Sequence, residues 1–217
     1  MTTTVAACHS CEGRCCTAYI VPLNGDDVWR IVQEQRLAPG LFVQHEAEKN
    51  PTSAGFLLRP RGQTNAIALR HQYDRRNERP CIFLMNLREG VQRCGIYAQR
   101  PIACQTYPMQ LQPTGVIPRE DMLCPGGSWA GITQRPGPWR ERLIRQDHEW
   151  QRYAGVVQAW NTAVRLRPSK TDYGLDQYLA YVVAAYDYLK SFGDQLPDMA
   201  RFDVALTALA EAWTSQS

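Results

Sequence analysis

The stretch CHSCEGRCC, residues 8–16, places four cysteines within nine residues, and the last two are adjacent. Cys8 and Cys11 form a C-x2-C pair, a spacing that lets one turn wrap two sulfurs around one ion. Neighbouring side chains of an extended chain point to opposite sides, so Cys15 and Cys16 are expected to serve different metals, or different metals of one cluster. A buried thiol at one of these two positions is the alternative.

Four further cysteines stand far apart along the chain, at Cys81, Cys94, Cys104 and Cys124. Eight thiolates are twice what one tetrahedral ion requires, so full use of them implies two sites or one polynuclear site. Zinc sites usually repeat paired cysteines, whereas scattered single ligands suit a cavity that receives a cluster. The pattern therefore favours iron or an iron–sulfur cluster, with zinc as the alternative. The predicted ligands are Cys8, Cys11, Cys15, Cys16, Cys81, Cys94, Cys104 and Cys124.

Eight thiolates also carry a negative charge that must be compensated when it is taken out of water. Arg14, Arg93 and Arg100 stand next to predicted ligands and could supply this compensation. The alternative is that these arginines are ordinary solvated surface residues.

The cysteines define the expected domain boundary, because none follows Cys124 in the chain of 217 residues. Residues 1–125 are predicted to form a cysteine-rich metal-binding unit. Residues 126–217 are predicted to form a Gly/Pro-rich linker followed by C-terminal helices. The start of the chain does not resemble a signal peptide, and no apolar run is as long as a membrane span. We therefore expect a cytoplasmic protein, in whose reducing surroundings disulfides are disfavoured.

Hydrophobic periodicity predicts an α+β fold that is mostly helical, with a small cysteine-rich unit of short strands and a C-terminal helical tail packed on it. A first helix is expected after Asn24, with Asp27 in its first turn, ending at Pro39 and Gly40. The aromatic residues of the tail recur at helical spacing and are predicted to be core faces. A second short helix is expected at 41–49, short strands at 55–59, 66–70, 80–85 and 91–97 with the last two as a hairpin, and tail helices within 139–164, 175–189 and 199–213.

The motifs CHSCEGRCC, DDVWRI, CIFL and RCGIYAQRPIACQTYP, taken in this order, resemble the YkgJ-like family of cysteine-cluster proteins. The resemblance covers about 8–125, and the C-x3-CC spacing before Cys15 differs by one residue from the C-x2-CC form of the family. It implies chelation of zinc or iron and no particular reaction. Carried over by position, it implies that Cys8, Cys11, Cys15, Cys16, Cys81, Cys94 and Cys104 are ligands, with Cys124 just beyond them.

The segment 59–79 contains six arginines but only two acidic residues. This segment or the C-terminal helices could dock a protein partner, and the alternative for the segment is a solvated hairpin without a partner. Nucleic acid is not expected, because Tyr73 is the one aromatic residue there that could stack on a base.

Three functions follow from these patterns. The favoured one is a protein with an iron–sulfur or polynuclear iron centre, acting in electron transfer, metal handling, or assembly or modification of a partner. The first alternative is a structural zinc-binding adaptor that presents its arginine-rich surface. The second is a metal-dependent enzyme of unknown reaction, for which the sequence shows no paired carboxylates and no phosphate loop.

Overall fold

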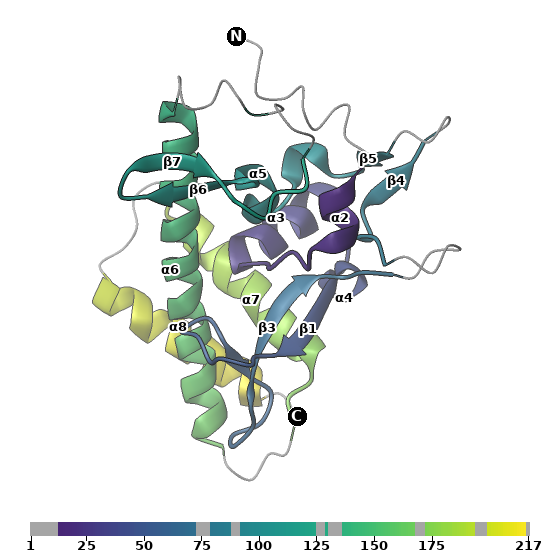
Figure 1. Ribbon diagram of the computed structural model, residues 1–217. Coiled ribbons are helices and arrows are strands. Elements are labelled where there is room, and N and C mark those ends of the chain that lie inside the picture. The colour runs from purple at the N-terminus through teal and green to yellow at the C-terminus, as the bar shows by residue number, and fades with distance from the viewer. Residues whose placement is uncertain are drawn as a thin grey trace. The chain divides into compact units, whose positions relative to one another are not determined.

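The computed structural model describes residues 13–72, 79–87, 92–124, 129, 136–167, 172–193 and 199–215 (Figure 1). The fold is α+β, as predicted, and helix makes up 51 % of it. The chain divides into two compact units, each built from two stretches of sequence. Unit 1 comprises Met1–Val21 and Leu69–His148, and unit 2 comprises Pro22–Ala68 and Glu149–Ser217.

Unit 1 contains every cysteine of the chain and is built from short elements. Its two antiparallel pairs are β4 with β5 and β6 with β7. The first residues of the long helix α6 also belong to it. The elements are α2 (Arg14–Ala18), β4 (Leu84–Asn86), β5 (Gln92–Cys94), the 3-10 turn η2 (Tyr97–Gln99), α5 (Ile102–Thr106), β6 (Met109–Gln112), β7 (Gly115–Pro118) and the start of α6 (Gly137–Arg165).

Unit 2 combines a three-stranded sheet, in the order β1-β3-β2, with most of the helical residues. Helix α7 contacts α3, α4 and α8, so it is the central helix of this unit (Figure 1). The elements are α3 (Gly25–Gln35), α4 (Pro39–Phe42), β1 (Val43–Ala47), β2 (Phe56–Leu57), β3 (Thr64–Leu69), the remainder of α6, α7 (Leu175–Lys190) and α8 (Met199–Ser215).

The core of unit 2 is aromatic, as the helical spacing of its side chains predicts. The ring of Trp160 on α6 lies 5.3 Å from that of Tyr178 and 5.2 Å from that of Tyr181, both on α7. All three side chains are fully buried. The indole N–H of Trp160 donates to the carbonyl of Leu57 at 2.7 Å, and the hydroxyls of Tyr153 and Tyr178 are bonded at 2.7 Å. The buried polar ends of these rings are thus satisfied inside the core.

The predicted first helix is confirmed, and so is the reason for its start. Asn24 accepts a hydrogen bond from the Asp27 amide at 2.9 Å, and the Asp27 carboxylate accepts one from the Asn24 amide, which makes a capping box. Its predicted end is wrong, because α3 ends at Gln35 and Pro39 begins α4 instead. Proline suits the first position of a helix as well as it ends one.

The helix predicted at 41–49 is also wrong. Residues Val43–Ala47 form β1, which pairs with β3. Pairing with a strand from elsewhere in the sequence overrides a weak local preference. By contrast, the hairpin of β4 and β5 and the three tail helices are confirmed, although residues 88–91 between the two strands lie outside the described residues. The boundary at 125/126 stays a prediction.

We predict that Gly25→Ala destabilises the protein, because a Cβ there would lie 2.2 Å from Cε2 of the buried Tyr186 ring. Overpacking of this kind typically costs about 1–3 kcal/mol. Gly137→Ala is the matched control, since Gly137 also begins a helix but its Cβ would meet nothing within 4 Å. Chemical denaturation of both variants tests this, and equal stability of the two would contradict the predicted clash.

Candidate metal site

The adjacent cysteines lie on the short helix α2, and Gly13 allows that helix to approach the β4–β5 hairpin. Gly13 has a left-handed backbone with φ of 68°, and its carbonyl accepts the Cys16 amide at 2.9 Å. A Cβ at this position would lie 2.6 Å from Oε1 of Gln92 and 3.1 Å from Cδ1 of Leu84. The left-handed backbone therefore favours glycine, and a larger residue would also displace the ends of the Gln92 and Leu84 side chains.

Backbone pairing joins Cys81 to this helix and Cys94 to the strand that follows Cys81. The amide of Cys81 donates to the carbonyl of Cys16 at 2.7 Å, which ties two predicted ligands together through the main chain. Cys81 is buried, with 7 % of its surface exposed. Cys94 is the last residue of β5 and lies opposite Leu84 of β4. Leu84 follows Cys81 by three residues. The hairpin therefore brings Cys94 back toward Cys81.

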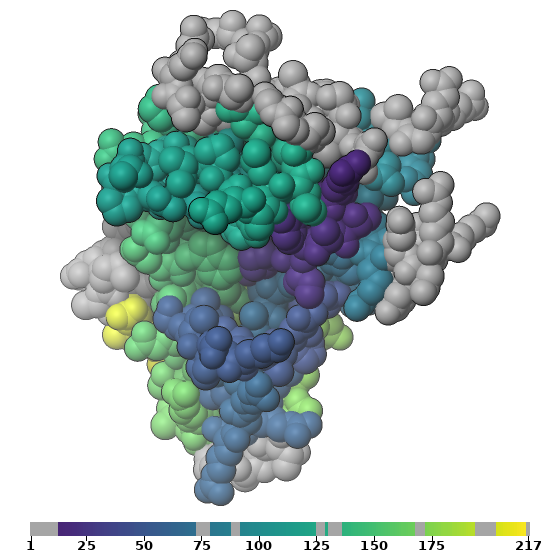
Figure 2. All heavy atoms as spheres, in the orientation of Figure 1, coloured from purple at the N-terminus to yellow at the C-terminus, as the bar shows by residue number. Residues whose placement is uncertain are grey.

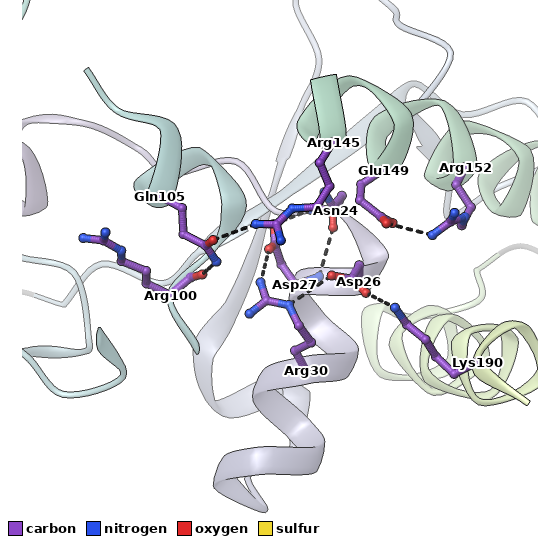
Figure 3. A network of polar contacts seen from close by, with 10 residues as sticks. All are labelled: Asn24, Asp26, Asp27, Arg30, Arg100, Gln105, Arg145, Glu149, Arg152 and Lys190. Atoms are coloured by element: carbon purple, nitrogen blue, oxygen red, sulfur yellow. Dashed lines mark hydrogen bonds and ion pairs between the residues drawn. The ribbon is translucent and has the colours of Figure 1, made fainter. Parts of the chain in front are cut away.

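Cys104 lies on the short helix α5, for which Pro101 is the N-cap. The side-chain amide of Gln105 donates to the Arg100 carbonyl at 2.7 Å and holds the start of this helix. The Gln105 oxygen in turn accepts from Arg145 of α6 at 2.9 Å (Figure 3). These contacts fix the helix that carries Cys104 within unit 1.

The thiols of this region act on one another electrostatically. The pKa of Cys15 is lowered to about 7, chiefly because the Cys16 thiol donates a hydrogen bond to it, while burial opposes the shift. That same hydrogen bond raises the pKa of Cys16, and burial and the charges of Cys15, Cys104 and Cys81 raise it further. Burial, above all, raises the pKa of Cys81 to about 11, and the charge of Cys94 adds to the effect. We call these five residues, Cys15, Cys16, Cys81, Cys94 and Cys104, the thiol cluster.

The other predicted ligands are placed differently. Cys8 and Cys11 lie outside the described residues. Cys124 is half-buried and packs against the apolar cluster of Met109, Val116, Trp129 and Trp139. Within the described ranges, no group of three or more His, Cys, Asp or Glu side chains is arranged to hold a metal ion.

The chemistry of the donor set fits a thiophilic metal. Thiolates are the soft ligands that zinc and iron–sulfur centres take, and one member of the cluster, Cys15, is already acidic enough to ionise near neutral pH. A cation would relieve the electrostatic cost of ionising Cys16 and Cys81. Because the described thiols alone do not form a ligand group, a complete site would require Cys8 and Cys11 or closer approach of the five sulfurs.

One of the arginines that stand next to predicted ligands, Arg100, contributes positive charge to this site. Arg100 lowers the pKa of Cys15 through its positive charge, and its guanidinium lies 4.2 Å from the centre of the Tyr97 ring. Sequence reasoning missed Tyr19, which follows the adjacent cysteines and contacts Tyr107. No sequence pattern marks Tyr19, because its partners lie about a hundred residues further along the chain.

Comparison with known families agrees with this chemistry. Residues 7–125 match the family CxxCxxCC, described as "putative zinc- or iron-chelating domain". The match spans more than half of the chain, which therefore belongs to this family of zinc- or iron-chelating cysteine-cluster domains. No curated protein and no solved structure gives a significant match. In the part of the chain that is described, no helix combines the length and the hydropathy that a bilayer crossing demands.

A second polar group lies in unit 2 and contains no cysteine (Figure 3). Asp26 at the start of α3 pairs with Arg30 at 3.0 Å and with Lys190 of α7 at 2.6 Å. Glu149 of α6 pairs with Arg152 at 2.7 Å through one oxygen, while its other oxygen is buried and has no hydrogen-bond partner among the described residues. The pKa of Glu149 is raised by burial and by Asp26, against the opposing charges of Arg152 and Lys190.

We predict that Cys15 of the metal-free, reduced protein is alkylated by iodoacetamide with a pH midpoint of about 7. In Cys16→Ala the midpoint moves upward, because the hydrogen bond that stabilises the Cys15 thiolate is lost. Mass spectrometry of each cysteine measures this. Cys81 is the internal control, since its reaction requires a pH near 11. Equal midpoints for Cys15 in the two proteins would contradict the assignment.

We also predict that Glu149→Gln becomes stabilising relative to the wild type as the pH rises. The pKa of Glu149 is raised on folding, so the wild type loses stability from the unfolded-state pKa of about 4.3 upward to the folded-state value. Glutamine cannot ionise and avoids this loss. Denaturation at pH 4 and pH 8 measures the difference, with the exposed Glu141→Gln of the same helix as control. A difference that is the same at both pH values would refute this prediction.

Proposed function

We propose that this chain binds iron, as a polynuclear or iron–sulfur centre, through its cysteine cluster. The observation that carries the proposal is the thiol cluster itself. Helix α2, strand β5, helix α5 and the segment that precedes β4, which contains Cys81, each contribute thiols to one region. Ligands that come singly from separate elements suit a polynuclear centre better than an isolated tetrahedral zinc ion. The proposed ligands are Cys8, Cys11, Cys15, Cys16, Cys81, Cys94 and Cys104, with Cys124 as an eighth.

The adjacent pair supports more than one metal. The Cys16 thiol donates to Cys15, so the two sulfurs differ strongly in their readiness to ionise. Binding to two different metal ions would allow both to be thiolates, because each negative charge would then have its own cation. Such a centre would serve electron transfer, metal handling, or the assembly or modification of a protein partner in the cytoplasm.

The family description supports zinc as the second candidate, since it names zinc together with iron. In that case the chain would be an adaptor whose metal is structural and whose surface binds a protein. The arginine-rich segment 59–79 is one proposed docking region, although Arg59 already pairs with Asp172 at 3.4 Å. The C-terminal helices are the other.

We predict that protein purified without oxygen contains iron and has visible absorption that bleaches with dithionite. Cys15→Ser and Cys16→Ser are each expected to lower the iron content, because each sulfur serves a different iron. Thr17→Ser, on the same helix, is the matched control and retains full iron. The measurements are iron, zinc and sulfide per chain together with an absorption spectrum.

A colourless protein with about two zinc ions per chain, unaffected by oxygen, would refute the iron assignment and establish the zinc adaptor. Iron without acid-labile sulfide would retain the polynuclear iron centre and remove the iron–sulfur cluster. A chain without bound metal would refute both candidates.

A further inference from the structure

Two tyrosines of unit 1 stand at the ends of the helices that carry cysteines. Tyr19 is the C-cap of α2, and its amide donates to the carbonyl of Cys15 at 3.2 Å. Tyr107 is the C-cap of α5, and its amide donates to the carbonyl of Ala103 at 3.0 Å. The centres of the two rings are 5.6 Å apart, with an angle of 57° between their planes. Ring contact therefore joins the ends of the two helices.

The hydroxyl groups of the same tyrosines bind the segment that leads to Cys124. The amide of Leu123 donates to the Tyr107 hydroxyl oxygen at 2.7 Å. The Tyr19 hydroxyl donates to the carbonyl of Asp121. The pKa of Tyr107 is raised by burial, and then by a hydrogen bond with Tyr19 and by the charge of Cys124. The Cys124 thiol thus lies within electrostatic reach of this pair.

The bound segment has its own local order. The guanidinium of Arg119 makes two hydrogen bonds of 2.9 Å to the carboxylate of Asp121. The backbone amide of Arg119 donates to the Pro108 carbonyl at 2.8 Å. In Figure 2 the purple residues of α2 lie at the surface beside the teal residues that include β6 and β7.

We propose that Tyr19 and Tyr107 are positioning residues that set the place of Cys124 relative to the thiol cluster, and thereby the tightness with which the metal is held. The inference rests on the proposed function, in which the cysteines hold metal. Two sets of contacts support it. The Tyr19 and Tyr107 hydroxyls bind the backbone of Asp121 and Leu123, on either side of Met122. Their rings join the helix of Cys15 and Cys16 to the helix of Cys104. Groups that orient ligands in this way typically change metal affinity by about 10- to 100-fold when removed.

The test uses Tyr19→Phe and Tyr107→Phe in the full chain, because phenylalanine retains the ring contact and removes only the hydroxyl. Both variants are expected to transfer metal to a chelator about 10-fold faster than the wild type and to shift the absorption spectrum of the bound centre. Cys124→Ala should cause the same changes, and adding Tyr107→Phe to it should cause no more, because both act through one sulfur. Tyr188→Phe, whose ring contacts Phe192 in unit 2, is the control.

The outcomes separate the inference from the proposed function. If the wild-type chain binds no metal, the proposed function is wrong. A wild type that binds metal, with variants of unchanged spectrum and transfer rate, overturns the positioning role alone. A lower melting temperature with an unchanged spectrum shows a merely structural pair and overturns it too. If Tyr107→Phe adds its full effect in the Cys124→Ala background, the tyrosine does not act through Cys124.

Discussion

The thiols that unit 1 brings together constrain one another's ionisation, and this constraint governs the chemistry of the site. Cys16 and Cys81 are held among other thiols at a depth where burial already disfavours charge, so both are hard to ionise. Cys15 ionises readily because Cys16 remains protonated and donates to it. In the metal-free cluster, Cys15 therefore ionises more readily than Cys16 and Cys81. A thiophilic cation would remove this difference in ionisation. It would replace the proton that Cys16 shares with Cys15, and its positive charge would stabilise each sulfur as a thiolate.

That crowding is imposed by the backbone rather than by the thiols. The Cys81 amide binds the Cys16 carbonyl, and Gly13, at the N-cap of α2, lies close to Leu84 and Gln92 of the hairpin. Contacts between residues so distant in sequence form together with the unit as a whole. Residues 22–68 interrupt unit 1 and belong to unit 2, where Asn161 of α6 binds the backbone of Gly55 and Leu57 at 2.8 Å. The site is thus assembled from two separate stretches of sequence.

The sequence predicted those features that depend on local chemistry. Asn24 and Asp27 marked the start of α3 through their capping side chains, and the spacing of Trp160 and Tyr178 with their neighbours marked core-facing helices. The sequence prediction was wrong where pairing with a distant strand decides the secondary structure, as in β1. It also missed the β6–β7 hairpin, in whose strand 109–112 apolar residues alternate with glutamine. The cysteines could be named as ligand candidates from their spacing alone. That Cys15 is the acidic thiol, or that Tyr19 meets Tyr107, depends on contacts that no local pattern records.

The stretches of sequence that carry the thiol cluster are rich in positive charge. The described stretches 13–21, 69–72, 79–87 and 92–107, which carry all five thiols, contain five arginines but no aspartate, glutamate or lysine. Divalent ions alone neutralise only part of the charge on many thiolates, and the remainder must be met by fixed positive groups or by solvent. Arginine suits this purpose because it stays protonated where a buried lysine would lose its proton. Arg100 already acts on Cys15 in this way, so this arginine belongs to the charge of the metal site as well as to the surface.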